Sequence, residues 1–176
     1  MNAVDILTDA FDRLPDLVTA AVRDLAPDQM TFRIDPGANT IAWLIWHLTR
    51  VQDDHIADVM GAEQLWTAEG WADRFALPFD VAATGYGQSP TEIGAVRVSD
   101  PALLTAYYDA VHARTINYIA GLRESDFDRI VDTRWEPPVT LGVRLVSVAA
   151  DDLEHVGQAA FVRGVVLRRQ RPAAPD

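Results

Sequence analysis

Residues 39–61 read NTIAWLIWHLTRVQDDHIADVMG, and this stretch decides the fold of the chain. At about 3.6 residues per turn, its apolar side chains gather into one stripe, made of Ile41, Leu44, Leu48, Val51 and Val59. Trp43, His47 and Asp54 lie along the border of that stripe. Asn39 is a favourable N-cap, and Gly61 suits the position just after a helix. The pattern therefore predicts one long helix that points polar atoms towards the interior of the protein.

A second polar patch on an apolar helix face lies about a hundred residues later, in residues 140–164, TLGVRLVSVAADDLEHVGQAAFVRG. One predicted helix face carries Leu141, Leu145, Val148, Asp152, His155, Ala159 and Val162, with Asp151 beside them. Asp151 and His155 are four residues apart, so their Cβ atoms should lie about 5–6 Å apart on one side of the helix. That spacing allows two side chains to hold one ion.

A histidine from a facing helix would complete such a metal site, and His47 is the candidate. Two imidazoles and one carboxylate leave coordination positions open, which suits a catalytic zinc or ferrous ion better than a closed structural site. The alternative is that Asp151, Asp152 and His155 belong to a solvated face, or to a buried ion pair with Arg144 or Arg50.

The remaining segments complete a helical bundle. Residues 3–25 show helical apolar spacing, in which Pro15 should cause a kink or a restart. Another helix should begin at Asp100 and Pro101 and end at Gly121. The prediction is an all-α four-helix bundle, with a long irregular connection between the second and third helices. One domain should span residues 1–176, with a flexible tail from about residue 168.

The long connection, residues 62–99, is rich in aromatic residues but broken by glycine and proline. Short helices are expected near residues 67–75 and 90–96. Its aromatic side chains either plug the end of the bundle or form the wall of a pocket, and they are Trp66, Trp71, Phe75, Phe79 and Tyr86. Residues 125–139 should be irregular or form a short hairpin-like crossing, because the WEPPV sequence excludes a helix.

Composition limits the function classes. The chain has no cysteine, so any sulfur chemistry requires a thiol brought by a cosubstrate. The formal charge of −11, from 15 basic and 26 acidic side chains, disfavours nucleic acid and anionic lipid as partners. The acidic start lacks the features of a signal peptide, and the longest apolar run, IAWLIW, is too short to span a membrane. We therefore expect a cytoplasmic protein, with a homodimer left open.

The two quoted segments resemble the DinB/YfiT-like superfamily of metal-binding four-helix bundles, and most of all the actinobacterial mycothiol S-transferases. The resemblance runs over nearly the whole chain. It implies a divalent metal bound by His47 from the second helix and by the pair Asp151 and His155 from the last long helix. The superfamily more often has histidine where this chain has Asp151. Thiol transfer favours zinc, with nickel or ferrous iron as alternatives.

The function implied by this resemblance is metal-dependent transfer of mycothiol, a low-molecular-weight thiol, to an electrophile. Asp152, Asp54 and His55 are candidates to orient the metal ligands or to accept a proton. Trp43, Arg50 and Arg144 are candidates for substrate contact, whereas His112 is interpreted as structural. The alternatives are a metal-dependent hydrolase or isomerase on the same scaffold, and a non-catalytic, stress-related protein that binds a metal or small molecule.

Overall fold

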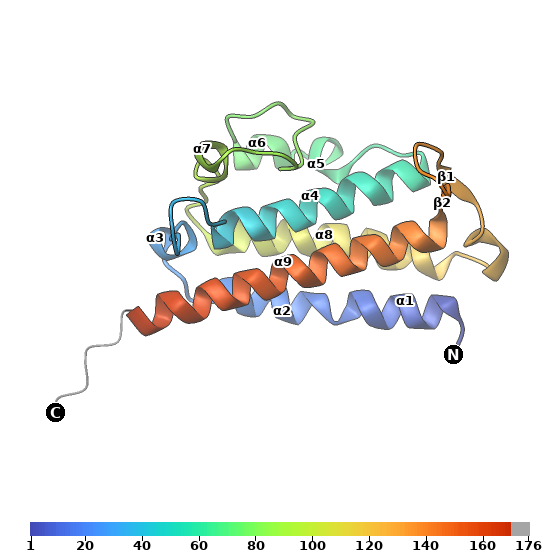
Figure 1. Cartoon of the computed structure of the whole chain (residues 1–176), viewed down its shortest axis with the longest axis horizontal. Coiled ribbons are helices and arrows are strands. Elements are labelled where there is room, and N and C mark those ends of the chain that lie inside the picture. The colour runs from blue at the N-terminus through green and yellow to red at the C-terminus, as the bar shows by residue number, and fades with distance from the viewer. Residues whose placement is uncertain (170–176) are drawn as a thin grey trace.

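A computed structural model describes residues 1–169 and shows an elongated bundle of long helices (Figure 1). The elements are α1 (Ala3–Asp12), α2 (Leu14–Val22), α3 (Pro27–Met30), α4 (Ile41–Met60), α5 (Leu65–Ala68), α6 (Trp71–Phe75), α7 (Pro90–Ile93), α8 (Pro101–Ala120), a 3₁₀ turn (Glu124–Asp126), β1 (Ile130–Asp132), β2 (Val139–Thr140) and α9 (Leu141–Arg169). Helix α9 packs against α4 and α2, and α8 packs against α4, α1 and α2. The predicted all-α four-helix bundle is confirmed. No helix of the described chain is long and apolar enough to cross a membrane.

The first bundle helix is divided at Arg13 into α1 and α2, with Pro15 in the first turn of α2. A proline is tolerated there because the first backbone N–H groups of a helix have no intrahelical acceptor. Leu7 and Phe11 of α1, and Leu14 and Val18 of α2, all face the core. Pro15 therefore marks the restart that the sequence predicted, and the two short helices together form one side of the bundle.

Helix α4 is buried on almost every side, because loops cover the face that the bundle leaves open. Its N-cap is Thr40 and not the predicted Asn39: the Thr40 hydroxyl accepts a hydrogen bond from the Trp43 amide at 3.1 Å. At the other end, Gly61 adopts a left-handed conformation with φ 64°, as predicted for this position. The caps fix where α4 begins and thus the direction of its polar side chains.

Helix α9 begins directly after the short hairpin of β1 and β2. The Thr140 hydroxyl accepts a hydrogen bond from the Val143 amide at 3.3 Å, in the manner of a helix cap. The helix then continues through Gly164 to Arg169, so residues 168 and 169, placed by the prediction in the tail, are helical. The rest of the predicted tail, residues 170–176, lies outside the described residues.

The irregular segments lie over α4 and at one of its ends (Figure 1). The predicted helix near 67–75 is two short helices, α5 and α6, because Gly70 between them takes a left-handed conformation with φ 70°. The second predicted short helix is α7. The predicted hairpin-like crossing forms a two-stranded antiparallel sheet, in which Ile130 pairs with Thr140 and Asp132 with Val139. These segments supply the walls of the site described next.

Candidate metal site

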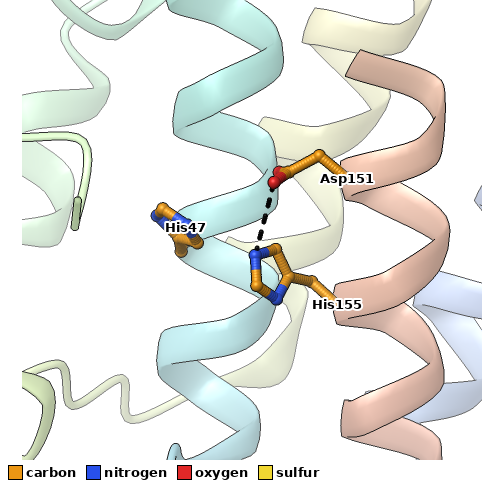
Figure 2. A group of neighbouring side chains, drawn as sticks. All are labelled: His47, Asp151 and His155. Carbon is orange, nitrogen blue, oxygen red and sulfur yellow. Dashed lines mark ion pairs between the residues drawn. The ribbon is translucent and has the colours of Figure 1, made fainter. Parts of the chain in front are cut away.

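Three side chains from two helices converge at the middle of the bundle (Figure 2). His47 projects from α4, while Asp151 and His155 project from one face of α9, one turn apart. One ligand atom of each residue lies within 4.8 Å of those of the other two. The imidazole centroids are 4.8 Å apart, and His155 Nε2 lies 3.5 Å from Asp151 Oδ1. The structure thus brings together the three residues predicted as metal ligands.

Hydrogen bonds orient both imidazoles, and they leave one ring nitrogen of His47 free for a metal. His47 Nδ1 donates to the carbonyl oxygen of Thr84 at 2.6 Å, so its Nε2 carries the lone pair. His155 Nδ1 faces the side-chain oxygen of Gln158 at 3.4 Å, and its Nε2 faces Asp151. Within residues 1–169, Asp151 Oδ2 is buried and has no hydrogen-bond partner. A buried carboxylate oxygen normally has a partner, so the donor set fits a cation.

The pKa values of the three groups differ because their surroundings differ. Burial lowers the pKa of His47 more than its bond to Thr84 raises it. The hydrogen bond to Asp151 raises the pKa of His155 against the effect of burial. Burial raises the pKa of Asp151, but the hydrogen bond and charge of His155, with the other histidines, lower it overall. Without metal, Asp151 and His155 therefore form an ion pair, and a cation would displace the proton on His155.

A loop from the long connection is held against α4 by three side chains of that helix, and we call residues 83–88 the strap. The contacts are His47 Nδ1 to the Thr84 carbonyl at 2.6 Å, Arg50 Nε to the Ala83 carbonyl at 3.3 Å and Trp43 Nε1 to Gln88 Oε1 at 2.7 Å. Because positions 43, 47 and 50 share one helix face, the same face that presents the metal ligand also binds the strap.

Gly85 allows the strap to approach the metal ligand this closely. Its φ is +101°, a conformation that side-chain-bearing residues rarely adopt. A Cβ atom at this position would lie 2.6 Å from His47 Nδ1 and 3.1 Å from Trp46 Cζ3. Any residue other than glycine would push either the imidazole or the strap away from its present position.

The predictions of Trp43 and Arg50 as substrate contacts are wrong. Helix spacing shows which residues share a face, but not how deeply that face is buried. Trp43 is buried and stacks on His47, with ring centroids 4.4 Å apart and an angle of 18° between the planes. It therefore supports the imidazole of His47, a candidate metal ligand, from behind. Arg50 is fully buried and donates to Gln64 Oε1 at 2.7 Å and to the Tyr107 hydroxyl at 3.3 Å. Arg50 joins the loops to the bundle and does not face the cavity.

The predicted alternative of an ion pair between Asp151 and an arginine is also wrong. Arg144 NH2 lies 2.9 Å from Asp132, and Arg50 NH1 lies 3.7 Å from Asp53. Each arginine thus has another acid as its partner. The carboxylate of Asp151 is left to the two histidines.

A cavity of about 630 Å³ is lined by two of the three converging side chains, His47 and Asp151. Its walls come from α4, the strap, the hairpin and α9, and its lining consists of His47, Val51, Asp54, His55, Thr84, Tyr86, Asp132, Arg134, Trp135, Arg144 and Asp151. This volume is typical of sites for small molecules. Arg144, Asp54 and His55 line it as candidates from the sequence, whereas the contributions of Asp132 and of the hairpin loop were not predicted.

Most aromatic residues of the long connection pack in the core. Trp66, Trp71 and Phe75 contact the Tyr107 ring, at centroid distances of 5.4, 5.3 and 5.8 Å. Tyr86 alone among the five predicted wall residues lines the cavity over the metal ligands. The long connection therefore combines the two arrangements that the sequence left open. Most of its rings pack in the bundle, and Tyr86 lines the cavity.

Asp54 and His55 differ in the hydrogen bonds that they make. Burial and then the charge of Arg144 lower the pKa of His55, and its Nδ1 accepts a hydrogen bond from Arg144 NH1 at 2.9 Å. The lone pair of this neutral imidazole is thus in use. Asp54 Oδ1 accepts from Gln64 Nε2 at 2.6 Å, while Asp54 Oδ2 makes no hydrogen bond within the described part of the chain. Asp54 is the better-placed proton acceptor of the two.

Asp152 and His112 lie outside the cavity. Asp152 is fully buried, neither of its oxygen atoms has a hydrogen-bond partner among residues 1–169, and burial raises its pKa well above the usual value. Its predicted role in orienting the ligands or accepting a proton does not agree with this position. His112 Nε2 lies 3.2 Å from Asp12 of α1, which is a contact between bundle helices.

Comparisons with known proteins agree with this geometry. The family model of the DinB superfamily matches residues 10–159. The crystal structure of a conserved protein from Enterococcus faecalis is similar, with a TM-score of 0.89 and 28% sequence identity over 96% of this chain and 99% of that chain. Among curated proteins, no sequence matches. Because the family model spans most of the bundle and all three converging side chains, the chain belongs to the DinB superfamily.

Proposed function

We propose that this protein holds a divalent metal at His47, Asp151 and His155 and uses it to activate a low-molecular-weight thiol for transfer to an electrophile. The observation that carries the proposal is the convergence of three possible ligand atoms within 4.8 Å of one another, two of them from residues that line a cavity of about 630 Å³. The superfamily is often metal-binding and includes enzymes. The resemblance to mycothiol S-transferases supports a thiol, and mycothiol in particular. The lack of cysteine means that the sulfur must come from a cosubstrate.

A divalent cation in this site would supply one chemical effect, namely a lower thiol pKa than the ordinary value of about 8.5, so that thiolate predominates at neutral pH. Two imidazoles and one carboxylate leave coordination positions for a substrate. Zinc is the proposed metal, with nickel and ferrous iron as alternatives that the same ligand set accepts.

The protein's own side chains supply orientation and a place for the proton. Thr84 fixes His47 in the tautomer with a free Nε2, and Trp43 stacks on that ring and keeps it in plane. Asp54 lines the same cavity, and in this proposal its carboxylate accepts the proton lost by the thiol. The sulfur electron pair then forms the carbon–sulfur bond, and the leaving group of the electrophile departs with its bonding electrons.

The test is the initial rate of thiol conjugation to 1-chloro-2,4-dinitrobenzene by the zinc-loaded protein. Mycothiol is expected to react faster than glutathione, as the resemblance implies, and Asp151→Ala should lower the rate about tenfold or more. Asp126→Ala, on the surface beside Arg123, serves as a control that keeps full activity. Equal rates for wild type and Asp151→Ala, or no conjugation by a protein that retains its metal, would favour a binding protein. Ester hydrolysis without any thiol would favour the hydrolase alternative.

A further inference from the structure

Two arginines share one carboxylate at the edge of the cavity. Asp132 ends β1 and accepts hydrogen bonds from the Arg134 amide at 2.9 Å, Arg134 Nε at 3.0 Å, Arg134 NH2 at 2.8 Å and Arg144 NH2 at 2.9 Å. The hydrogen bonds of Arg134 hold the pKa of Asp132 well below its usual range, so this carboxylate stays charged at neutral pH. Two guanidinium groups against one carboxylate leave a positive charge without a partner inside this group.

The two arginines differ in what they contribute. The Arg144 side chain is only 11% exposed, and it joins α9 to the hairpin and to His55. The Arg134 side chain is 81% exposed, at the rim of the same cavity. An exposed ion pair adds little to stability, so stability does not account for Arg134. The hydrogen bonds to Asp132 instead fix the orientation of the exposed Arg134 guanidinium group.

The other charged groups around the cavity lie nearer its floor or outside it. Asp151 belongs to the group of metal ligands, and Asp54 is half-buried on α4 next to His55. Asp58, an exposed residue of α4, acts on Arg134 and His55 only through its charge. A divalent cation would offset the charge of Asp151, so the rim remains the cationic part of the protein surface in this cavity.

Two exposed aromatic rings line the same cavity as the arginine pair. The exposed fraction is 66% for Trp135 of the hairpin loop and 93% for Tyr86 of the strap. Both line the cavity although they come from distant parts of the chain. Rings of this size usually bury most of their surface, and an exposed pair at the mouth of a pocket is available to stack on a ligand.

We infer that Arg134 and Arg144, with Trp135, form a carboxylate-binding subsite, so that a substrate of this pocket carries a carboxylate next to a flat apolar group. A guanidinium group matches a carboxylate in planarity and hydrogen-bond spacing, which an ammonium group does not. The inference rests on the proposed function only in taking this cavity as the substrate pocket. The carboxylate belongs to the electrophile where the thiol is mycothiol, which carries none, or to a different thiol that carries one, since both substrates must enter the same cavity.

Calorimetric titration of the zinc-loaded protein with phenylacetate and with phenylacetamide tests the subsite. Phenylacetate should bind more tightly than the amide, and Arg134→Gln should weaken phenylacetate about fivefold or more without affecting the amide. Arg123→Gln is a matched control, because Arg123 is 82% exposed and paired with Asp126 but does not line the cavity. The NMR signal of the Trp135 indole N–H should shift when phenylacetate binds. Equal binding of acid and amide, or unchanged phenylacetate binding by Arg134→Gln, would overturn the subsite, since the acid would then bind only at the zinc.

A second titration distinguishes the two sources of the carboxylate and separates this inference from the proposed function. If phenylacetate binds equally well with saturating 2-mercaptoethanol, the subsite is present and serves the electrophile. If 3-mercaptopropionate, a thiol that carries a carboxylate, competes with phenylacetate and Arg134→Gln weakens both, the subsite is present and serves the thiol. A protein whose cobalt spectrum does not respond to 2-mercaptoethanol would contradict thiol activation, and the comparison of phenylacetate with its amide would still decide the subsite.

Discussion

His47 is held from three directions: by its own helix, by the stacked ring of Trp43 and by the carbonyl oxygen of Thr84. Such support fixes the tautomer and the plane of a metal-binding imidazole, and its loss typically weakens metal binding ten- to a hundredfold. The position of the strap is therefore part of the metal site, although no atom of the strap is a proposed ligand.

Replacing Gly85 with alanine should weaken zinc binding about tenfold, because the new Cβ would lie 2.6 Å from His47 Nδ1. Gly87→Ala is the matched control, since Gly87 also has a positive φ, +72°, but nothing lies within 4 Å of a Cβ there. Both variants should lose some thermal stability through backbone strain. Zinc titrations of the two proteins provide the measurement, and equal affinities would show that the contact with His47 is unimportant.

His155→Ala should abolish retention of metal through dialysis, because it removes one of the three converging ligand atoms. His112→Ala should retain metal like the wild type, because His112 contacts Asp12 on another side of the bundle. Metal content per chain, measured after dialysis, compares the two. Retention by His155→Ala, or an equal loss in His112→Ala, would mean that the metal is bound elsewhere.

Zinc affinity should rise with pH as His155 loses its proton. The pKa of His155 is raised above the ordinary 6.5 by the hydrogen bond to Asp151, and metal needs the neutral imidazole. In the metal-free protein, the stability due to this raised pKa is fully present below pH 6.5 and is lost as pH rises through the folded-state value. The stability due to the lowered pKa of Asp151 is present above pH 3.8 and is lost as pH falls through its folded-state value.

Calorimetry of zinc binding between about pH 6 and pH 8, in buffers with different ionisation enthalpies, measures this linkage. Proton release should be largest at the low end of the range, where His155 is still protonated. Affinity and proton release that do not change with pH would contradict the ion pair between Asp151 and His155.

At the scale of elements, the junction between α4 and the long connection depends on Arg50. Its side chain is fully buried and bonds to Gln64, Tyr107 and the carbonyl of Ala83. Arg50→Ala should lower the free energy of unfolding by about 3 kcal/mol, because the buried carboxylate of Asp53 and the acceptors of Arg50 would lose a partner. Urea denaturation measures the change. Arg123→Ala, which removes an exposed arginine, should leave the midpoint unchanged, and similar midpoints for both variants would refute the structural role of Arg50.

The long helices could be predicted because each carries its own local signals. α4 has an apolar stripe and a terminal glycine, and α8 has Asp100 as its N-cap before Pro101. The boundaries were less predictable, since Asn39 and Thr40 are both good N-caps and only the tertiary structure selects Thr40. The rings of α5 and α6 pack on Tyr107 of α8 on both sides of the break at Gly70, and local spacing does not describe this packing.

The candidate site, like the fold, could be predicted only in part from the sequence. The placement of Asp151 and His155 on one face follows from their spacing within a single helix, and the polar border of a facing helix made His47 the candidate partner, in agreement with the resemblance. Arg50 and Trp43 were misinterpreted as substrate contacts, because the loop that covers them comes from a distant part of the chain. Arg134 and Trp135 could not be assigned to the cavity before the hairpin was seen beside α9.

Across the whole molecule, the bundle provides rigidity and the irregular segments provide the walls of the pocket. α4 and α9 pack side by side and hold the three candidate ligand atoms in place (Figure 1). The strap and the hairpin, which come from different segments of the sequence, line the cavity next to them. Binding sites are often built in this way, with chemistry on rigid elements and selectivity on loops. Substitutions in the strap or hairpin should therefore change ligand preference more than they change the fold.

The central claim is that one metal at His47, Asp151 and His155 binds and activates a thiol. The most direct measurement is the absorption spectrum of the cobalt-substituted protein during titration with mycothiol. If the proposal is right, we expect one cobalt ion per chain and a new near-ultraviolet sulfur-to-cobalt charge-transfer band. This band should saturate with mycothiol and be absent from His155→Ala. A wild-type protein that keeps its cobalt but shows no change in this spectrum with mycothiol or any other thiol would contradict the account.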